Sequence, residues 1–303
     1  MRTTTDSIGN ITYPDEICFA FNPTYVKVEN CSAKALTVSV TDYTTTHSME
    51  VMCYNGTCVI NLSRTLQLLF DTYYIVNQRT KEVTVNVGSF TFTTVVIWGY
   101  ICPGERFGGS RTVRWFRFFP MTVSVFDGQQ FTERTTIESS GIRIGQSWDF
   151  TFDYTFQAGP AQTINFLVDD SRDGIFLRWI DRHGVLQYWL FSKGIKETKN
   201  NQGGNELTMN YIDRELNSFR NIKRQQYFFS EITQALCAPN VTEEEYTMLE
   251  SILTSPVIDL YHPSTIVGWE PVRIAKGTNK RSTDVLQDFE FEIELPNINA
   301  QSL

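Results

Sequence analysis

The sequence contains little of what common catalytic and metal-binding sites are built from. It has three histidines in 303 residues and no GxSxG, HExxH or P-loop motif. Its six cysteines form no CxxC pair, which disfavours a zinc site. His47, His183 and His262 each lie in a stretch typical of a turn or loop. We therefore expect no catalytic residue, no cofactor and no metal ligand.

Long apolar runs and an excess of positive charge are also missing. No segment has the 18 consecutive apolar residues of a membrane span, and residues 1–10 are polar, unlike a secretory signal peptide. The formal net charge is −8, whereas dedicated nucleic-acid binders carry an excess of Lys and Arg. The sequence predicts no membrane span and no nucleic-acid partner.

Strand-forming residues are abundant, with 22 Phe and 13 Tyr. Apolar and polar residues alternate in four segments, which are 36–41, 83–87, 148–157 and 289–295. A period of two places one face of a strand in the core and the other in water. In the last segment Glu290, Glu292 and Glu294 occupy the polar positions, where acidic side chains deter edge pairing.

Helical signals are few and short. Leu62, Leu66, Leu69 and Phe70 have the spacing of one helix face, which predicts a helix that begins near Ser63. Thr242 and Glu245 have the spacing of a capping box and predict a helix near 243–254. Ser255-Pro256 then ends that helix.

Turn signals separate the strands. The segments 176–180 and 185–191 flank Asp181-Arg182-His183-Gly184 and predict an aromatic-rich hairpin. Gly203-Gly204 also predicts a turn. The segment 211–229 fits a strand-loop-strand or a frayed helix equally well.

We therefore expect a mainly β fold of two β-sandwich or barrel-like domains, each with a short helix. The best boundary lies near Gly159-Pro160, after the aromatic alternating segment. This gives an N-terminal β domain over 1–158 and a C-terminal β domain over 159–303, with the helix near 243–254.

Cys53 and Cys58 flank Asn55-Gly56, the strongest short hairpin signal. If Tyr54 pairs with Thr57, Cys53 faces Cys58 at a distance that could allow a disulfide bond. A pair of reduced thiols is the favoured alternative, because the cytosol is reducing.

Asp169, Ser171, Asp173 and Gly174 match the start of a calcium-binding loop. The twelfth position of such a loop needs a carboxylate, and Ile180 stands there. We favour a turn before a strand and leave open whether an ion binds near Asp169 to Asp173.

Residues 111–119 interleave arginines with aromatic side chains. This mixture fits an amphipathic strand, a subunit interface or a surface that stacks nucleic-acid bases, and the net negative charge disfavours the third. We predict interface anchors among five side chains, which are Trp98, Trp115, Arg117, Trp179 and Trp269.

Several stretches, in order along most of the chain, resemble tail structural proteins of bacteriophages and prophages of Bacteroidetes. The stretches are 19–28, 59–71, 97–99, 118–125, 177–191 and 253–274. This resemblance implies a tail-tip or baseplate subunit of the virion, assembled in the host bacterial cytoplasm. Its partners would be copies of itself and other virion tail proteins, and a contact with the host surface stays open. No catalytic residue is implied.

The sequence therefore predicts a non-enzymatic virion structural subunit that assembles through β-surfaces. The alternative is a carbohydrate- or cell-surface-binding β-sandwich module, whose exposed aromatic side chains would stack on sugar rings. An enzyme with an unfamiliar site is the least favoured hypothesis.

Overall fold

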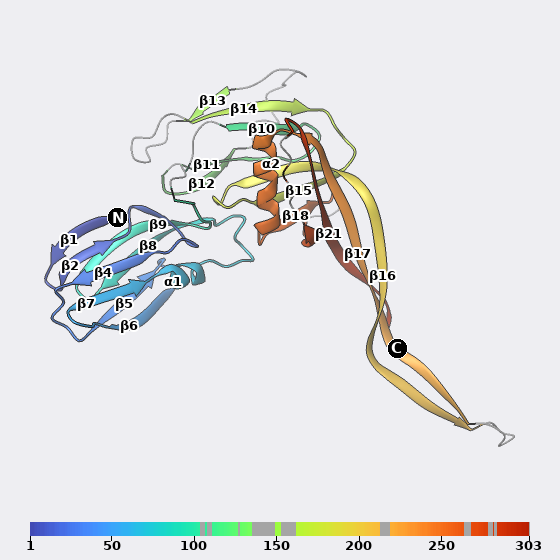
Figure 1. Cartoon of the computed structure of the whole chain (residues 1–303), viewed down its shortest axis with the longest axis horizontal. Helices are drawn as coiled ribbons and strands as arrows, with labels where there is room; N and C mark the ends of the chain where they lie inside the picture. Colours follow the sequence, from blue (N-terminus) through green and yellow to red (C-terminus); the bar gives the residue numbers. More distant parts are fainter. Residues whose placement is uncertain are drawn as a thin grey trace. The chain divides into compact units, whose positions relative to one another are not determined.

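The protein was analysed as a computed structural model, which describes residues 1–103, 107, 111–126, 128–134, 149–152, 162–212, 219–263, 268–277, 281 and 284–302. The predicted fold class is confirmed, because strands predominate in the described residues and the helices there are few and short (Figure 1). Two compact units can be distinguished. The N-terminal unit contains Met1–Arg172, Trp179–Tyr188 and Thr254–Pro256, and the C-terminal unit contains Asp173–Arg178, Trp189–Leu253 and Val257–Leu303. The predicted boundary near 159–160 lies outside the described residues.

Two sheets of mainly antiparallel strands form the first part of the N-terminal unit. Side chains that alternate along their strands are buried, including Val26, Val28, Val38, Val83 and Val85. Each sheet thus has one buried face, as in a β-sandwich. The four-stranded sheet has the order β1 (Arg2–Asp6), β2 (Gly9–Tyr13), β4 (Tyr25–Glu29) and β7 (Thr57–Asn61), and the five-stranded sheet has the order β3 (Ile17–Phe19), β9 (Phe90–Ile97), β8 (Thr80–Val87), β5 (Ala35–Thr41) and β6 (Thr46–Met52).

Helix α1 (Ser63–Leu68) follows β7, as predicted. Leu62, Leu66, Leu69 and Phe70 are buried, so the expected apolar face covers the core. The Ser63 hydroxyl donates to the carbonyl oxygen of Asn22 at 2.9 Å and fastens the start of the helix to the chain before β4.

The same unit contains a three-stranded sheet and a two-stranded sheet. Their strands are β10 (Arg111–Phe116), β14 (Gln162–Asp169) and β13 (Asp149–Phe152), in this order, and β11 (Val123–Phe126) with β12 (Phe131–Arg134). β10 and β14 pair in parallel. Strand β13 coincides with residues 149–152 of the predicted aromatic strand, whose remaining residues lie outside the described part of the chain.

A seven-stranded sheet supplies most of the C-terminal unit. Its order is β19 (Trp269–Pro271), β18 (Ile258–Tyr261), β15 (Ile175–Ile180), β16 (Leu186–Ile212), β17 (Phe219–Val241), β21 (Gln287–Ser302) and β20 (Arg273–Gly277). Phe289, Phe291 and Ile293 are buried on β21, whereas the glutamates between them face the other way, as predicted.

Helix α2 (Glu243–Glu250) and the 3-10 turn η2 (Ser251–Thr254) confirm the predicted helix near 243–254. Thr242 and Glu245 form the predicted capping box, in which each side chain binds the other residue's backbone N–H. The Tyr246 ring packs edge-on against Phe289, with ring centroids 5.3 Å apart, and this contact places α2 on β21.

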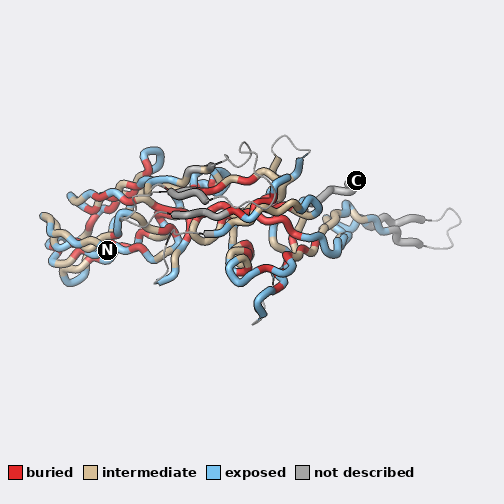
Figure 2. The backbone as a smooth tube through the Cα atoms, turned by 90° about the horizontal axis from the view of Figure 1, so that it is seen from above, coloured by how far each residue is buried: buried red, intermediate tan, exposed pale blue. Residues whose placement is uncertain are grey.

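The longest elements are β16, with 27 residues, and β17, with 23 residues. They pair antiparallel from Ser192–Cys237 to Ile212–Phe219, and we call this pair of segments, 192–212 and 219–237, the ribbon. The structure therefore has strand at 211–212 and 219–229, the first of the two alternatives for that segment. Residues 192–200 are exposed along β16, and much of the described ribbon is exposed or intermediate (Figure 2).

The turn predicted at Gly203-Gly204 is wrong. The strand continues there, with a shift of register between Gly203 and Glu206 and a φ of 75° at Gly204. A β-bulge uses the positive φ of glycine just as a turn does, so the dipeptide alone does not distinguish the two. The Tyr227 ring also lies over Gly203, where an added Cβ would come within 2.2 Å of it.

Candidate functional site

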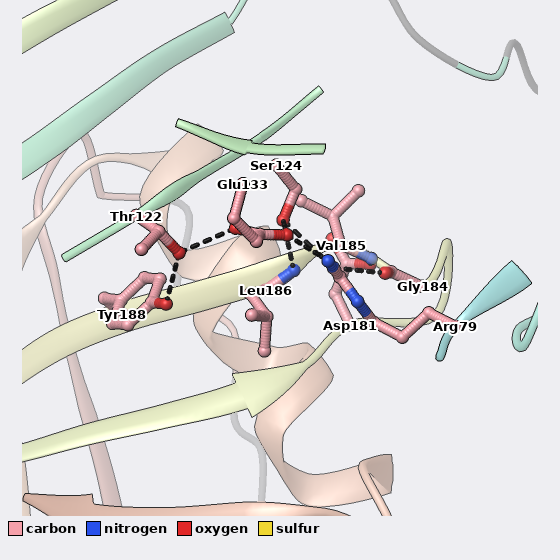
Figure 3. A network of polar contacts seen from close by, with 9 residues as sticks. All are labelled: Arg79, Thr122, Ser124, Glu133, Asp181, Gly184, Val185, Leu186 and Tyr188. Atoms are coloured by element: carbon pink, nitrogen blue, oxygen red, sulfur yellow. Dashed lines mark hydrogen bonds and ion pairs between the residues drawn. The ribbon is translucent and has the colours of Figure 1, made fainter. Parts of the chain in front are cut away.

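A buried arginine organises the polar interior of the N-terminal unit. Arg79, which precedes β8, is only 4% exposed. Its Nη1 donates to Ser124 Oγ at 3.0 Å and to the carbonyl oxygen of Gly184 at 2.9 Å (Figure 3). Its Nη2 forms an ion pair with Glu133, and its guanidinium lies 4.6 Å from the centroid of the Phe131 ring. The charge is therefore paired and hydrogen-bonded, as a buried charge requires.

Two hydroxyl groups donate hydrogen bonds to the Glu133 carboxylate. Thr122 Oγ1 donates to one carboxylate oxygen at 2.6 Å and Ser124 Oγ donates to the other at 2.7 Å. Thr122 also shares a 2.7 Å hydrogen bond with the Tyr188 hydroxyl (Figure 3). We call Arg79, Thr122, Ser124, Glu133 and Tyr188 the arginine network.

The chemistry of Ser124 is limited by this network. Its hydroxyl donates to Glu133 and accepts from Arg79 and from the backbone N–H of Leu186, the last at 3.1 Å. A hydroxyl has one proton and two lone pairs, so its hydrogen-bonding capacity is used. A nucleophile needs a base that takes its proton and a lone pair aimed at substrate. The arrangement instead fastens β11, β12 and the start of β16 to one another.

The hairpin loop between β15 and β16 is held by one carboxylate. Asp181 accepts hydrogen bonds from the backbone N–H groups of His183 and Val185, both at 2.9 Å, and from the Gln187 side chain at 2.8 Å. The predicted aromatic hairpin is confirmed, and His183 contributes to it through its backbone.

A pocket of about 490 Å³ lies beside this loop within the N-terminal unit. The Trp98 ring forms its apolar wall and packs edge-on against Phe21, with centroids 4.7 Å apart. Phe21 is 43% exposed, and Tyr100 is also exposed. We call this site the aromatic pocket; it is lined by Phe21, Trp98, Gly99, Tyr100, Ile180, Asp181, Arg182, Thr254, Ser255 and Pro256.

The walls of the aromatic pocket are fixed by hydrogen bonds. The Asn22 amide donates to the carbonyl oxygen of Ile101 at 2.7 Å and accepts from the Ile101 N–H at 2.8 Å. The Phe21 N–H donates to the carbonyl oxygen of Gly99 at 3.0 Å. A largely apolar pocket with a few polar groups at its rim suits a small ligand with an apolar face. No periodic or motif signal marked this site, because its residues come from four separate segments.

The predicted interface anchors occupy different environments. Trp98, Trp115 and Trp179 are buried in the chain, and Trp179 is 0% exposed. Their burial leaves a partner little indole surface to cover. Arg117 is exposed, with its guanidinium 3.7 Å from Asp170. Trp269 is half-buried under Arg178, whose guanidinium lies 4.2 Å from the ring centroid. For all five side chains the interface role stays a prediction.

The carboxylate of Asp169 is committed to protein groups. Arg114 Nη1 lies 3.2 Å from it, and the Ser171 N–H donates to it at 2.9 Å. Burial alone raises the pKa of Asp169, but the hydrogen bonds from Ser171 and Arg114 outweigh burial and lower it. Within the described residues, no group of three or more His, Cys, Asp or Glu side chains is placed to hold a metal ion.

The Asn55-Gly56 turn is confirmed, with Tyr54 paired to Thr57 and φ values of 48° and 70°. All six cysteines lie in the described part of the chain and none of them is in a disulfide bond, so Cys53 and Cys58 are not bonded. Cys53 Sγ lies 3.6 Å from Cys31 Sγ, a neighbour that the sequence did not indicate.

Comparison with known proteins places the chain in no group. No protein-family model matches it, and no curated protein sequence matches it significantly. In the part of the chain that the structure describes, no helix has the length and apolar character needed to cross a bilayer.

Proposed function

We propose that the protein is a non-enzymatic structural subunit that assembles with copies of itself and with neighbouring subunits through the ribbon. The observation that carries this proposal is the length of the ribbon. Its β16 segment, 192–212, spans about 70 Å at roughly 3.3 Å per residue. Strands of globular domains usually have five or six residues, so the ribbon is far longer than the sheet of one domain needs.

In the described residues, the outer part of the ribbon is a pair of strands without a third strand beside it. β21 pairs with β17 as far as Tyr227–Ser302, and β16 and β17 continue as a pair from there to Ile212–Phe219. Isolated two-stranded hairpins are marginally stable in water at best. Contact with another subunit would bury more of this two-stranded part and so stabilise it.

Apolar side chains are exposed along the ribbon. Ile195 is 82% exposed, and Leu207, Tyr227 and Phe228 are exposed as well. Large exposed apolar side chains are typical of interaction surfaces. Lys193, Lys196 and Lys199 line the same part of β16, and edge lysines deter uncontrolled strand pairing. We therefore expect the contacts to use the faces of the ribbon rather than its backbone edge.

The place of assembly follows from the sequence resemblance alone. It favours the tail tip or baseplate of a bacteriophage that infects Bacteroidetes, with assembly in the host cytoplasm. The hydrogen bonds of Ser124 and the ion pair of Asp169 are all made with other protein groups, which supports a structural rather than a catalytic role.

Sedimentation of the purified full chain tests the proposal. We expect an assembled species for the natural sequence and a monomer for the double variant Leu207→Ser/Phe228→Ser. Val285→Ser is the matched control, because Val285 is 87% exposed outside the ribbon. A monomer at all concentrations, or equal assembly of both variants, would refute the use of the ribbon. Antibody labelling of released phage particles then tests the location, and absence of label from every particle removes the virion assignment.

The aromatic pocket favours a second candidate, a carbohydrate-binding module. Aromatic rings present flat apolar faces, and Phe21 and Tyr100 are accessible beside Trp98. Screening against a glycan array tests this candidate. Binding should fall at least tenfold in Phe21→Ala and stay unchanged in Tyr43→Ala, because Tyr43 is 76% exposed away from the pocket. No glycan signal for the natural chain would eliminate it.

A further inference from the structure

Three cysteines gather at one end of the first two sheets. Cys31 follows β4, Cys53 follows β6 and Cys58 lies in β7. Cys53 Sγ lies 3.6 Å from Cys31 Sγ, and the Cys58 thiol is a second hydrogen-bonding neighbour of Cys53. Cys53 therefore has two thiols within reach, although only Cys58 is close to it in the sequence.

Backbone hydrogen bonds hold these residues in place without any covalent link. The Cys31 N–H donates to the carbonyl oxygen of Gly56 at 2.8 Å, so the loop after β4 is fastened to the Asn55-Gly56 turn. The Cys53 N–H donates to the carbonyl oxygen of Lys34 at 2.8 Å and extends the pairing of β5 with β6. The sulfur atoms of Cys31 and Cys53 thus meet as a consequence of the fold.

The cysteine pair is close to bonding geometry. A disulfide has an S–S distance of about 2.0 Å, so the two sulfurs need to approach by roughly 1.6 Å. We propose that Cys31 and Cys53, rather than Cys53 and Cys58, form a disulfide bond when the folded protein meets an oxidising environment. This bond would join the four-stranded sheet, through the end of β4, to the five-stranded sheet, through the end of β6.

The reaction is a thiol–disulfide exchange with a low-molecular-weight disulfide, for which oxidised glutathione is the reagent. Cys53 is partly exposed, whereas Cys31 and Cys58 are buried. The Cys53 sulfur, having lost its proton, attacks one glutathione sulfur, and a mixed disulfide forms as one glutathione thiolate leaves. Cys31, also deprotonated, then attacks the Cys53 sulfur and releases the second glutathione. The protein loses two protons and two electrons, and the reagent accepts both electrons.

The environment of the thiols sets the rate of this exchange. Burial, together with the neighbouring thiols Cys31 and Cys58, raises the pKa of Cys53. Burial also raises the pKa of Cys58. Because the thiolate is the attacking species, the exchange is slow at neutral pH and accelerates as the pH rises. On the proposed function, the subunit stays reduced during assembly in the cytoplasm and the bond forms after release.

The test uses the folded full chain, first reduced and then incubated with oxidised glutathione. The remaining thiols are blocked, the protein is digested and the linked peptides are identified by mass spectrometry. We expect a Cys31–Cys53 linkage, and we expect the intact mass to fall by two hydrogen atoms. Oxidation should also raise the temperature of unfolding of the natural chain. These readouts need no variant and do not depend on whether the protein assembles.

Variants assign the roles of the three thiols. Cys58→Ser should keep the Cys31–Cys53 linkage, and Cys31→Ser should lose it together with the shift in unfolding temperature. Cys237→Ser, on β17 in the other unit, is the matched control and should oxidise like the natural chain. A linkage only between Cys53 and Cys58, a stable glutathione adduct on Cys53, or six unreacted thiols would each overturn the proposal.

Discussion

Gly99 lies directly against the backbone of Arg182. A Cβ added to Gly99 would come within 2.3 Å of the Arg182 carbonyl oxygen. The neighbouring Tyr100 N–H donates to that same oxygen at 2.6 Å. The chain after β9 and the loop after β15 are therefore joined backbone to backbone. This contact forms part of the aromatic pocket, so its shape depends on the absence of a side chain at position 99.

The variant Gly99→Ala should destabilise the N-terminal unit by about 1–3 kcal/mol, because the new methyl group meets a carbonyl oxygen that cannot move aside alone. Urea unfolding followed by tryptophan fluorescence measures the loss. Ser48→Ala, at an exposed position on β6, should leave the midpoint unchanged. Equal stability of Gly99→Ala and the natural chain would show that the two segments are not in contact.

Replacement of Arg79 should be among the most damaging single changes. Arg79→Met removes the ion pair of Glu133 and two hydrogen bonds, and breaking a buried pair costs about 3–5 kcal/mol. The double variant Arg79→Met/Glu133→Leu should recover part of this loss, because it leaves no unpaired carboxylate. A double-mutant cycle by chemical denaturation gives the coupling energy. Strictly additive losses would mean that the two side chains do not interact.

Low pH should reduce the stability of the N-terminal unit, because Asp42 becomes protonated. Burial alone would raise the pKa of Asp42, but hydrogen bonds from Lys81, the Thr45 N–H and Thr44 lower it from 3.8 to about 2. A carboxyl whose pKa is lower in the folded state stabilises that state above its unfolded pKa. This stabilisation is lost as the pH falls from about 4 towards about 2.

The pH dependence can be isolated with Asp42→Asn. This variant should be less stable than the natural chain at pH 7, and the difference should shrink as the pH falls through the window between about 4 and 2. Unfolding midpoints measured across this range give the comparison. A constant difference at every pH would exclude the titration of Asp42 as the cause.

The capping box of α2 should be measurable in the C-terminal unit. Thr242 Oγ1 accepts from the Glu245 N–H at 3.3 Å, and Thr242→Ala should cost about 1 kcal/mol because that donor loses its partner. Thr247→Ala is the control on the same helix. Its hydroxyl donates to the Glu243 carbonyl oxygen and accepts from Arg281 at 3.3 Å, and both are exposed contacts that add little to helix stability. Thermal unfolding followed by circular dichroism at the helix wavelength separates the two variants.

Local patterns were sufficient for most single elements. Alternation predicted the buried faces of β5, β8 and β21, and the capping residues predicted α2, because these features depend on neighbours a few residues away. The Asn55-Gly56 turn was predicted for the same reason. Gly203-Gly204 carries a similar local signal but lies in a bulge, because the partner strand continues past it.

The sites depend on residues that are far apart in the sequence. Arg79 and Glu133 are separated by 54 residues, and Cys31 and Cys53 by 22. Neither pairing has a sequence signature, since each results from the order of strands in the sheets. Likewise, the sequence around a tryptophan does not show whether its side chain lies in a core or at an interface. The burial of Trp179 is seen only in the folded structure.

The sequence by itself determined the β class, the short helices and the faces of the main strands. These features depend on the periodicity of apolar residues and on helix capping, which involve residues only a few positions apart. The tertiary structure decided which side chains meet, and with them the arginine network, the aromatic pocket and the thiol pair. It also decided that β16 and β17 continue together as a ribbon, because strand pairing over such a length depends on the register between two distant segments.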